Sequence, residues 1–263
     1  MKRGYQRNYS DLKPAVFDSD RRIKKADTIV KVCQDFLKED DLSHLHLLDV
    51  GSSSGIIDNH LANYFGHVTG IDIDEPAMAH ARATFCKDNL SFQQGDAMQM
   101  ALEDNSVDVV VCTQIYEHVP SAERMFAEIF RVLKPRGFCY FSGNNRVMFM
   151  EPHYRLPLLS LLPRPIAHRY LRLMGKGSYY HELHFSYWTL KRMCRDFNIT
   201  DYSAAVIAQP DRFGVEYMIE KGSLKWRAAS LVARYARYFA PLMWILQKPV
   251  QISTPKTGKT GSV

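Results

Sequence analysis

The chain has 263 residues, of which 46% are hydrophobic and 24% charged, with a formal net charge of +6 at pH 7. Such a length can bury the core of one α/β domain, whereas the longest apolar run, 239–246, is far shorter than the roughly 20 residues of a bilayer span. The first 13 residues lack the apolar core of a signal peptide, and the five cysteines form no C-x-x-C pair, so we expect reduced thiols and a cytoplasmic location.

The most informative segment is a strand, a tight turn and a helix start at residues 47–61. The apolar run that contains Asp49 breaks into small residues between Gly51 and Gly55 and resumes as a helical pattern. Small side chains let the backbone approach a ligand, and the helix start offers unpaired N–H groups. The turn predicts a nucleotide-like ligand. A dinucleotide turn is disfavoured because Ser53 and Ile56 replace its second and third glycines, and the lysine of a P-loop is absent.

Further strands and helices alternate along the chain. We predict strands at 67–74, 90–97, 107–113 and 138–142, with helices that begin at Glu75-Pro76 and after Ser121. The run at 107–113 is apolar after its opening Asp108, as expected for a parallel strand that is buried on both faces. This alternation predicts a parallel sheet that helices cover on both sides.

Five motifs in this order resemble those of the class I methyltransferases that use S-adenosylmethionine, and most closely the type 11 branch, which includes ubiquinone-biosynthesis enzymes. They are LDVG at 48–51, GID at 70–72, GDA at 95–97, DVVV at 108–111 and RVLKPRG at 131–137. The resemblance implies an α/β, Rossmann-like three-layer sandwich with a seven-stranded, mostly parallel sheet and an antiparallel last strand. Ser53 departs from the family pattern, because many relatives have a glycine there.

The resemblance also implies where S-adenosylmethionine would bind. The glycine turn would lie along the methionine part, Asp72 would hold the ribose hydroxyls, and Gln114 would cover the methionine end. The adenine would lie between the residues after the second and third strands. The full set of cofactor-binding residues expected on this basis is Asp49, Gly51, Ser52, Ser53, Gly55, Asp72, Ile73, Asp96, Ala97 and Gln114.

Methyl transfer from a sulfonium needs alignment and exclusion of water more than it needs catalytic groups. A hydroxyl acceptor would gain from a general base, and His118, with Glu117 beside it, is the best candidate after the fourth strand. His118 could instead shape its loop by hydrogen bonding. Weaker candidates, which we assign to the acceptor pocket, are Tyr116, His153, Tyr154 and His181. We expect no metal site, because His181 and His184 are three residues apart, not four as in the zinc-protease motif H-E-x-x-H.

The domain expected at 45–250 carries two basic inserts. A lid at about 146–185 would form the acceptor pocket, since it leaves the carboxyl end of a strand. A helical insert at about 221–240 has an apolar stripe that includes Leu224, Leu231 and Tyr235. That stripe would either pack on the domain or lie in a membrane interface at the inner face of a membrane. We further expect an N-terminal helical segment at 1–44 packed on the core, strands at 199–208 and 241–249, and a disordered tail at 251–263.

The motif series predicts an enzyme that methylates oxygen or carbon of a small or lipid-linked acceptor. The alternative is a non-catalytic S-adenosylmethionine-binding module associated with a membrane complex. Nucleic acid is a disfavoured partner, because no recognition helix, RNP-like strand or zinc spacing accompanies the basic segments.

Overall fold

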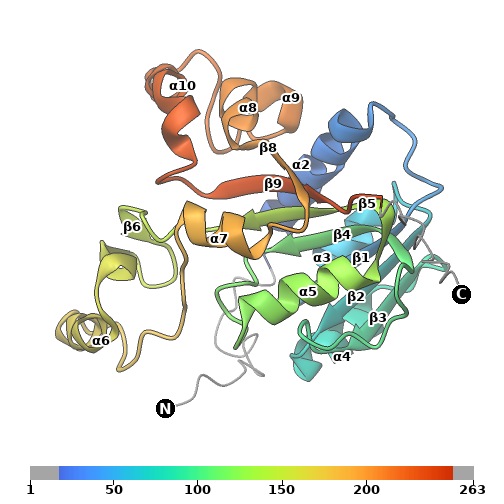
Figure 1. Ribbon diagram of the computed structural model, residues 1–263, viewed down its shortest axis with the longest axis horizontal. Helices are drawn as coiled ribbons and strands as arrows, with labels where there is room; N and C mark the ends of the chain where they lie inside the picture. Colours follow the sequence, from blue (N-terminus) through green and yellow to red (C-terminus); the bar gives the residue numbers. More distant parts are fainter. Residues whose placement is uncertain (1–17, 251–263) are drawn as a thin grey trace, which may run out of the picture.

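The computed structural model describes residues 18–250, whose centre is a seven-stranded sheet in the order β3-β2-β1-β4-β5-β9-β8 (Figure 1). The first five of these strands along the chain pair in parallel, whereas β9 is antiparallel to both β5 and β8. The expected fold class is therefore confirmed. The strands are β1 (His46–Val50), β2 (His67–Asp72), β3 (Leu90–Gln94), β4 (Val107–Thr113), β5 (Leu133–Gly143), β8 (Asn198–Asp201) and β9 (Leu242–Gln247).

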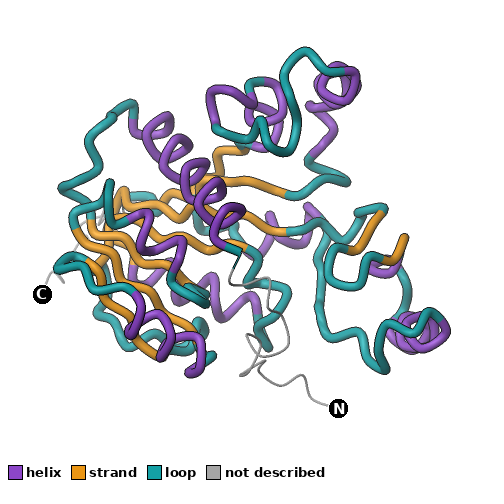
Figure 2. Tube along the Cα trace, turned by 180° about the vertical axis from the view of Figure 1, so that it is seen from behind, coloured by secondary structure: helices purple, strands orange, loops and turns teal. Residues whose placement is uncertain are grey.

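Helices cover both faces of this sheet (Figure 2). Alternate strand residues point to opposite faces, so Leu47 packs with one helix layer and Leu48 with the other. The layer on the Leu47 side contains α2 (Ser19–Leu37), α3 (Ile56–Leu61), α8 (Ser203–Ala208) and α9 (Pro210–Phe213), and the layer on the Leu48 side contains α5 (Ala122–Val132) and α7 (Tyr187–Met193). The helix α4 (Glu75–Thr84) packs on Phe92 of the edge strand β3.

One predicted strand differs from the structure and another agrees with it. Residues 199–208 do not form one strand, because β8 ends at Asp201 and α8 follows. The Asp201 carboxylate accepts a hydrogen bond from the Ser203 N–H, which turns the backbone into the helix, and the alanines that follow favour helix over strand. The predicted strand at 241–249 is present as β9, and its antiparallel direction is confirmed.

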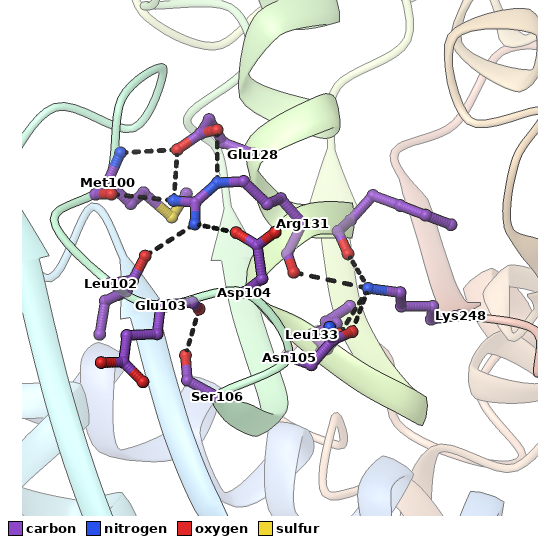
Figure 3. A network of polar contacts seen from close by, with 11 residues as sticks. Met100, Leu102, Glu103, Asp104, Asn105, Ser106, Glu128, Arg131, Leu133 and Lys248 are labelled. Carbon is purple, nitrogen blue, oxygen red and sulfur yellow. Dashed lines mark hydrogen bonds and ion pairs between the residues drawn. The ribbon is translucent and has the colours of Figure 1, made fainter.

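The amino end of β5 is held by two cations, the half-buried Arg131 and the buried Lys248 (Figure 3). Arg131 donates to the carbonyls of Met100 and Leu102 and pairs with Glu128 and Asp104. Lys248, which is 6% exposed, donates to the carbonyls of Phe130 and Leu133 and to Asn105. Both side chains donate to backbone carbonyls at this end of the sheet, so these carbonyls have hydrogen-bond partners. Arg131 of the RVLKPRG motif thus stabilises the end of the sheet that lies opposite the carboxyl ends of the parallel strands.

The lid forms a small lobe of its own (Figure 1). It contains the short strands β6 (Met150–Glu151) and β7 (Leu156–Pro157), the 3-10 helix η2 (Leu159–Leu161) and the helix α6 (Arg164–Leu173). These pack around a separate apolar cluster of Leu156, Leu159, Ala167, Leu171 and Tyr180. Because this cluster is distinct from the two cores of the sheet, the lobe has its own source of stability.

The helical insert contains α10 (Leu224–Ala236), which packs on the sheet layer through Trp226, Ala229 and Ala233. The predicted stripe points elsewhere, since Leu224 is 84% exposed and Leu231 is 80% exposed. The first alternative, in which this stripe packs on the domain, is therefore wrong for Leu224 and Leu231. Between residues 18 and 250, no helix combines the length and the apolar character that crossing a membrane requires. The expected tail at 251–263 and the first 17 residues of the N-terminal segment lie outside the described residues.

Candidate functional site

The site lies at the carboxyl ends of β1 and β4, where the strand order reverses direction. In open α/β sheets this switch point is where ligands bind. The glycine turn leaves β1 and begins α3, with Gly51 and Gly55 at φ values of +88° and +75°. A Cβ on Gly51 would lie 2.1 Å from Cδ1 of Ile115, so only glycine fits both the angle and the space. Ser53 has φ +55°, a left-handed conformation that explains the glycine of many relatives.

Asp72 is oriented by the glycine turn itself. One carboxylate oxygen accepts from the Ser53 N–H at 2.9 Å and the other from the Asp74 N–H at 2.9 Å. The Gly51 and Ser52 N–H groups meanwhile donate to the carbonyl of Ile71, which ties β1 to β2. Each Asp72 oxygen retains a further lone pair for a ligand hydroxyl. The arrangement agrees with the predicted ribose contact, which remains a prediction.

Acidic groups surround the turn. Asp49 and Asp58 are buried, and Ser52 donates to Asp58 at 2.8 Å. Burial raises the pKa of Asp58 to about 7, and burial together with the nearby Asp58 raises the pKa of Asp49 well above its usual value. Burial also raises the pKa of Asp72. A cationic ligand would stabilise these carboxylates, whereas a phosphate would be repelled by them.

Lys25 on α2 is a site residue that the sequence did not reveal. Its ammonium interacts with Asp49 and Glu117, and burial lowers its pKa to about 8, with repulsion from Arg22 as the next cause. A cation among carboxylates could hold the negative end of an amino-acid ligand. No motif or spacing links residue 25 to the turn, because only the packing of α2 on α3 brings them together.

The predicted adenine-side residues follow β2 and β3. Ile73 is half-buried beside Asp72, and Ala97 packs against the core on the α5 side. The Asp96 carboxylate accepts from the Met98 N–H at 2.8 Å, which shapes the loop after β3. These positions agree with the expected border of a ligand ring, and the contact itself stays a prediction.

At the end of β4, Gln114 has φ +61° and its side-chain oxygen accepts from the Asn144 amide at 2.6 Å. Asn144, a residue that the motifs missed, also lies 3.5 Å from Glu117. Tyr116 is fully buried in the core, where its hydroxyl donates to the Asn144 carbonyl. Tyr116 therefore supports the loop from below instead of lining an open acceptor pocket.

The predicted base lies in a cluster of imidazoles and carboxylates. The half-buried ring of His118 lies 5.0 Å from the ring of His153, which comes from the lid. Glu117 is fully buried, and burial raises its pKa although His184 lies nearby. His153 Nδ1 lies 2.6 Å from an oxygen of Glu151, and His184 Nε2 lies 3.3 Å from the same oxygen.

Glu151 and His184 were absent from the predicted site. Burial acts to raise the pKa of Glu151, but hydrogen bonds from His153 and His184 outweigh it and hold that pKa at about 2. Burial acts to lower the pKa of His153, but the bond to Glu151 outweighs it and raises the pKa. Among residues 18–250, two overlapping groups have ligand atoms close enough for one metal ion: Glu117 with His118 and His153, and Glu151 with His153 and His184.

The remaining acceptor-pocket candidates lie farther out. His181 is exposed, with its ring against Tyr179, and is not part of the cluster. Tyr154 packs edge-on against Tyr180 in the lid, and its hydroxyl donates to the Tyr179 carbonyl at 3.3 Å. The lid thus brings His153 to the end of β4 but keeps Tyr154 and His181 within its own lobe.

Comparison with known proteins adds an independent line of evidence. Residues 48–141 match the Methyltransf_11 family model, described as "Methyltransferase domain". A ubiquinone biosynthesis O-methyltransferase of Hydrogenovibrio crunogenus is 30% identical over 153 residues, which cover 56% of this chain and 59% of the relative. The sterol 24-C-methyltransferase ERG6B of Gibberella zeae is 40% identical over 98 residues, which cover 35% of this chain and 26% of the relative.

A solved structure of an S-adenosylmethionine-dependent methyltransferase from Mesorhizobium loti has the same fold, with a TM-score of 0.52 and 16% identity over 79% of this chain and 93% of that chain. The chain spans from about a quarter to three fifths of the length of the two curated relatives. The shared part contains the glycine turn and the ends of the first four parallel strands, whereas the family match ends before the lid.

Proposed function

The domain at residues 48–141 belongs to the class I, type 11 methyltransferases that use S-adenosylmethionine, and from that premise we propose that the chain is an enzyme that transfers a methyl group to oxygen or carbon of a small or lipid-linked acceptor. The observation that carries the proposal is the carboxylate-lined glycine turn. Asp49, Asp58 and Asp72 lie at and around the turn, and a bound cation would favour their ionised forms. A sulfonium cofactor is cationic, so it is stabilised there, whereas a dinucleotide is not.

The chain's own residues divide the work of binding. Asp72, already oriented by Ser53 and Asp74, accepts the ribose hydroxyls. Lys25 of α2 holds the carboxylate of the methionine part, because its ammonium interacts with Asp49 and Glu117 at the site. Gln114, fixed by Asn144, covers the methionine end. This fixed framework aligns sulfur, methyl and acceptor in line, and alignment can supply on the order of 7–11 kcal/mol of the barrier reduction.

For a hydroxyl acceptor, we assign the general base to His118 and a supporting role to Glu117. His118 is half-buried on the loop after β4 and faces the lid residue His153. Glu117 is fully buried and contacts the Asn144 amide, so it positions the loop and does not reach an acceptor directly. A carbon acceptor would use the same alignment and would need His118 only to remove a proton after transfer.

The test is cofactor binding and turnover in the full-length protein. Asp72→Ala removes acceptors of charge-assisted hydrogen bonds worth about 1.5–3 kcal/mol each, so calorimetry should show S-adenosylmethionine affinity at least about 100-fold weaker. His118→Ala should keep that affinity and lower the release of S-adenosylhomocysteine with a phenolic acceptor by roughly 10²–10⁴-fold. Undiminished binding by Asp72→Ala would contradict the cofactor site. Binding without turnover on any acceptor would favour a non-catalytic module.

The lid surface supports a lipid-linked acceptor and contact with an anionic membrane. On and after α6, Ile166, Leu173 and Met174 are exposed, with Leu173 at 84%. Arg169 and Arg172 are exposed on the same helix. Apolar side chains flanked by arginines are typical of helices that lie in a membrane interface. The lid joins this surface to His153, so an acceptor that partitions into lipid would reach the site from the membrane.

Vesicle flotation tests this part. Wild type should float with vesicles that contain anionic lipid, and Arg169→Glu/Arg172→Glu should not, because each basic residue near such a surface contributes about 1 kcal/mol. Arg124→Glu/Arg195→Glu is the matched control, since it makes the same change of charge at exposed positions on the α5 and α7 side. Equal flotation of the two double variants, or no flotation of wild type, would contradict membrane contact through the lid.

A further inference from the structure

The cluster at the base of the lid brings together three potential metal ligands from two parts of the chain. Glu151 ends β6, His153 follows it, and His184 comes from the segment between α6 and α7. One oxygen of Glu151 lies 2.6 Å from Nδ1 of His153 and 3.3 Å from Nε2 of His184. The three candidate ligand atoms all lie within 4.8 Å of one another. A single ion could contact all three after small side-chain movements.

Burial distinguishes this group from an ordinary surface cluster. The side chains of Glu151 and His184 are both 0% exposed, and that of His153 is 12% exposed. Burial of a carboxylate costs free energy unless a cation or hydrogen-bond donors compensate it. Two more carboxylates, Glu117 and Glu182, are buried beside the group. The arrangement concentrates negative charge and imidazole nitrogens in a dry place, which suits a bound cation.

A second, independent observation is that two buried polar atoms beside the group lack hydrogen-bond partners. Within residues 18–250, neither Nδ1 of His184 nor Oε2 of Glu182 has a hydrogen-bond partner, although both atoms are buried. His184 and Glu182 also line a cavity of about 110 Å³ inside the lid. Buried polar atoms without partners are uncommon and mark sites where a ligand or an ordered water is bound.

We propose that Glu151, His153 and His184 bind one divalent first-row transition ion, of which Zn²⁺ is the best match. Two imidazole nitrogens with one carboxylate oxygen form the ligand set of many catalytic zinc sites, which keep a fourth position open. Mg²⁺ and Ca²⁺ prefer ligand sets made of oxygen alone, so they fit this group poorly. The inference departs from the expectation of no metal site, which considered only His181 and His184.

The choice of this group over Glu117, His118 and His153 follows from the contacts. Glu117 lies 3.5 Å from the Asn144 amide and interacts with Lys25 on α2. One oxygen of Glu151 instead lies within 3.3 Å of nitrogens of both His153 and His184. His153 is the most exposed of the three ligands, and the ring of His118 lies 5.0 Å from it. The accessible side of the ion therefore faces the proposed base.

That geometry gives the ion a role, which rests on the proposed function. An acceptor oxygen bound to the ion on the His118 side would be held near the cofactor, and a divalent ion lowers the pKa of a bound hydroxyl. His118 would then receive the proton. The ion would also join β6 to the segment before α7, so that it fixes the lid over the site.

The test measures Zn²⁺ binding to the full chain after removal of metals with a chelator. Competition with a chromophoric chelator should show one Zn²⁺ for each chain, and X-ray absorption should show nitrogen and oxygen neighbours, including two imidazoles, at about 2.0–2.1 Å. His153→Ala and His184→Ala should each weaken binding by more than the roughly 100-fold that loss of a supporting residue costs. His181→Ala, an exposed histidine in the same segment as His184, is the control and should bind as wild type.

Because His184 is fully buried, circular dichroism must show that His184→Ala is folded, and the partly exposed His153→Ala gives the result if it is not. Absence of stoichiometric Zn²⁺ binding, or equal loss in His181→Ala, would overturn the proposal. Wild-type binding by His184→Ala with loss in Glu117→Gln would also overturn it. S-adenosylmethionine binding, measured on the same samples, separates the two inferences, because a protein that binds the cofactor but not zinc loses only the metal site.

Discussion

The glycine turn and the lid lie on either side of one site, yet they are built in different ways. The turn is short and local, because Gly51, Ser53 and Gly55 have left-handed backbone angles and Asp72 accepts a hydrogen bond directly from the Ser53 N–H. The lid instead joins residues more than 30 positions apart, such as Glu151 and His184, around its own apolar cluster. The difference teaches that the cofactor side depends on backbone shape and charge, whereas the acceptor side depends on packing.

The largest expected effect is at the turn. Gly51→Val places a branched side chain at φ +88° and against Ile115, so S-adenosylmethionine affinity should fall by about 100-fold or more, since such backbone strain costs on the order of 1–3 kcal/mol before any displacement of ligand. Ser53→Gly is the matched control: it relieves a left-handed serine and should bind within about threefold of wild type. Calorimetric titration measures both. Near-normal binding by Gly51→Val would show that backbone shape does not define this side.

This contrast also explains what the sequence could predict. The glycine turn, Asp72, Gln114 and the order of elements could be identified because each depends on neighbours in the chain, and residues 48–141 match a methyltransferase family model, as the motifs predict. Lys25, Glu151 and His184 were missed because they reach the site only through tertiary packing. Tyr116 was expected in the acceptor pocket but is buried in the core. The sequence of this loop does not indicate whether a side chain points into the pocket or into the core.

The second prediction tests whether the lid is stable by itself. Leu171→Ala leaves a cavity in the lid cluster, where Leu171 is 0% exposed, at a cost of about 2–5 kcal/mol. We expect faster hydrogen exchange across 150–185 but wild-type affinity for S-adenosylmethionine, because the cluster is separate from the cores beneath the turn. Leu173→Ala, two residues along the same helix and 84% exposed, should change neither quantity. Faster exchange in β1 or β4 would show that the two sides form one cooperative unit.

The third prediction concerns the carboxylate that is buried at the turn. Burial raises the pKa of Asp58 to about 7, far above the usual 3.8 of an unfolded chain. The folded protein therefore binds more protons than the unfolded chain between about pH 4 and 7, so this contribution to stability is complete below pH 4 and is lost as the pH rises to 7. Because 1 pKa unit corresponds to about 1.36 kcal/mol, the loss is on the order of 4 kcal/mol.

Asp58→Asn should remove that loss while it keeps the acceptor for Ser52. Denaturant unfolding at pH 5 to 8 should show a flatter pH dependence in this variant than in wild type, and the exposed Asp88→Asn should keep the wild-type slope. The same carboxylate attracts a cationic cofactor once it is ionised, so wild-type affinity for S-adenosylmethionine should increase as the pH rises through 7, and Asp58→Asn should weaken this increase. If the free energy of unfolding changes with pH in the same way in wild type and Asp58→Asn, the carboxylate does not contribute to the stability of the turn. The cofactor side would then depend on backbone shape alone and not on charge.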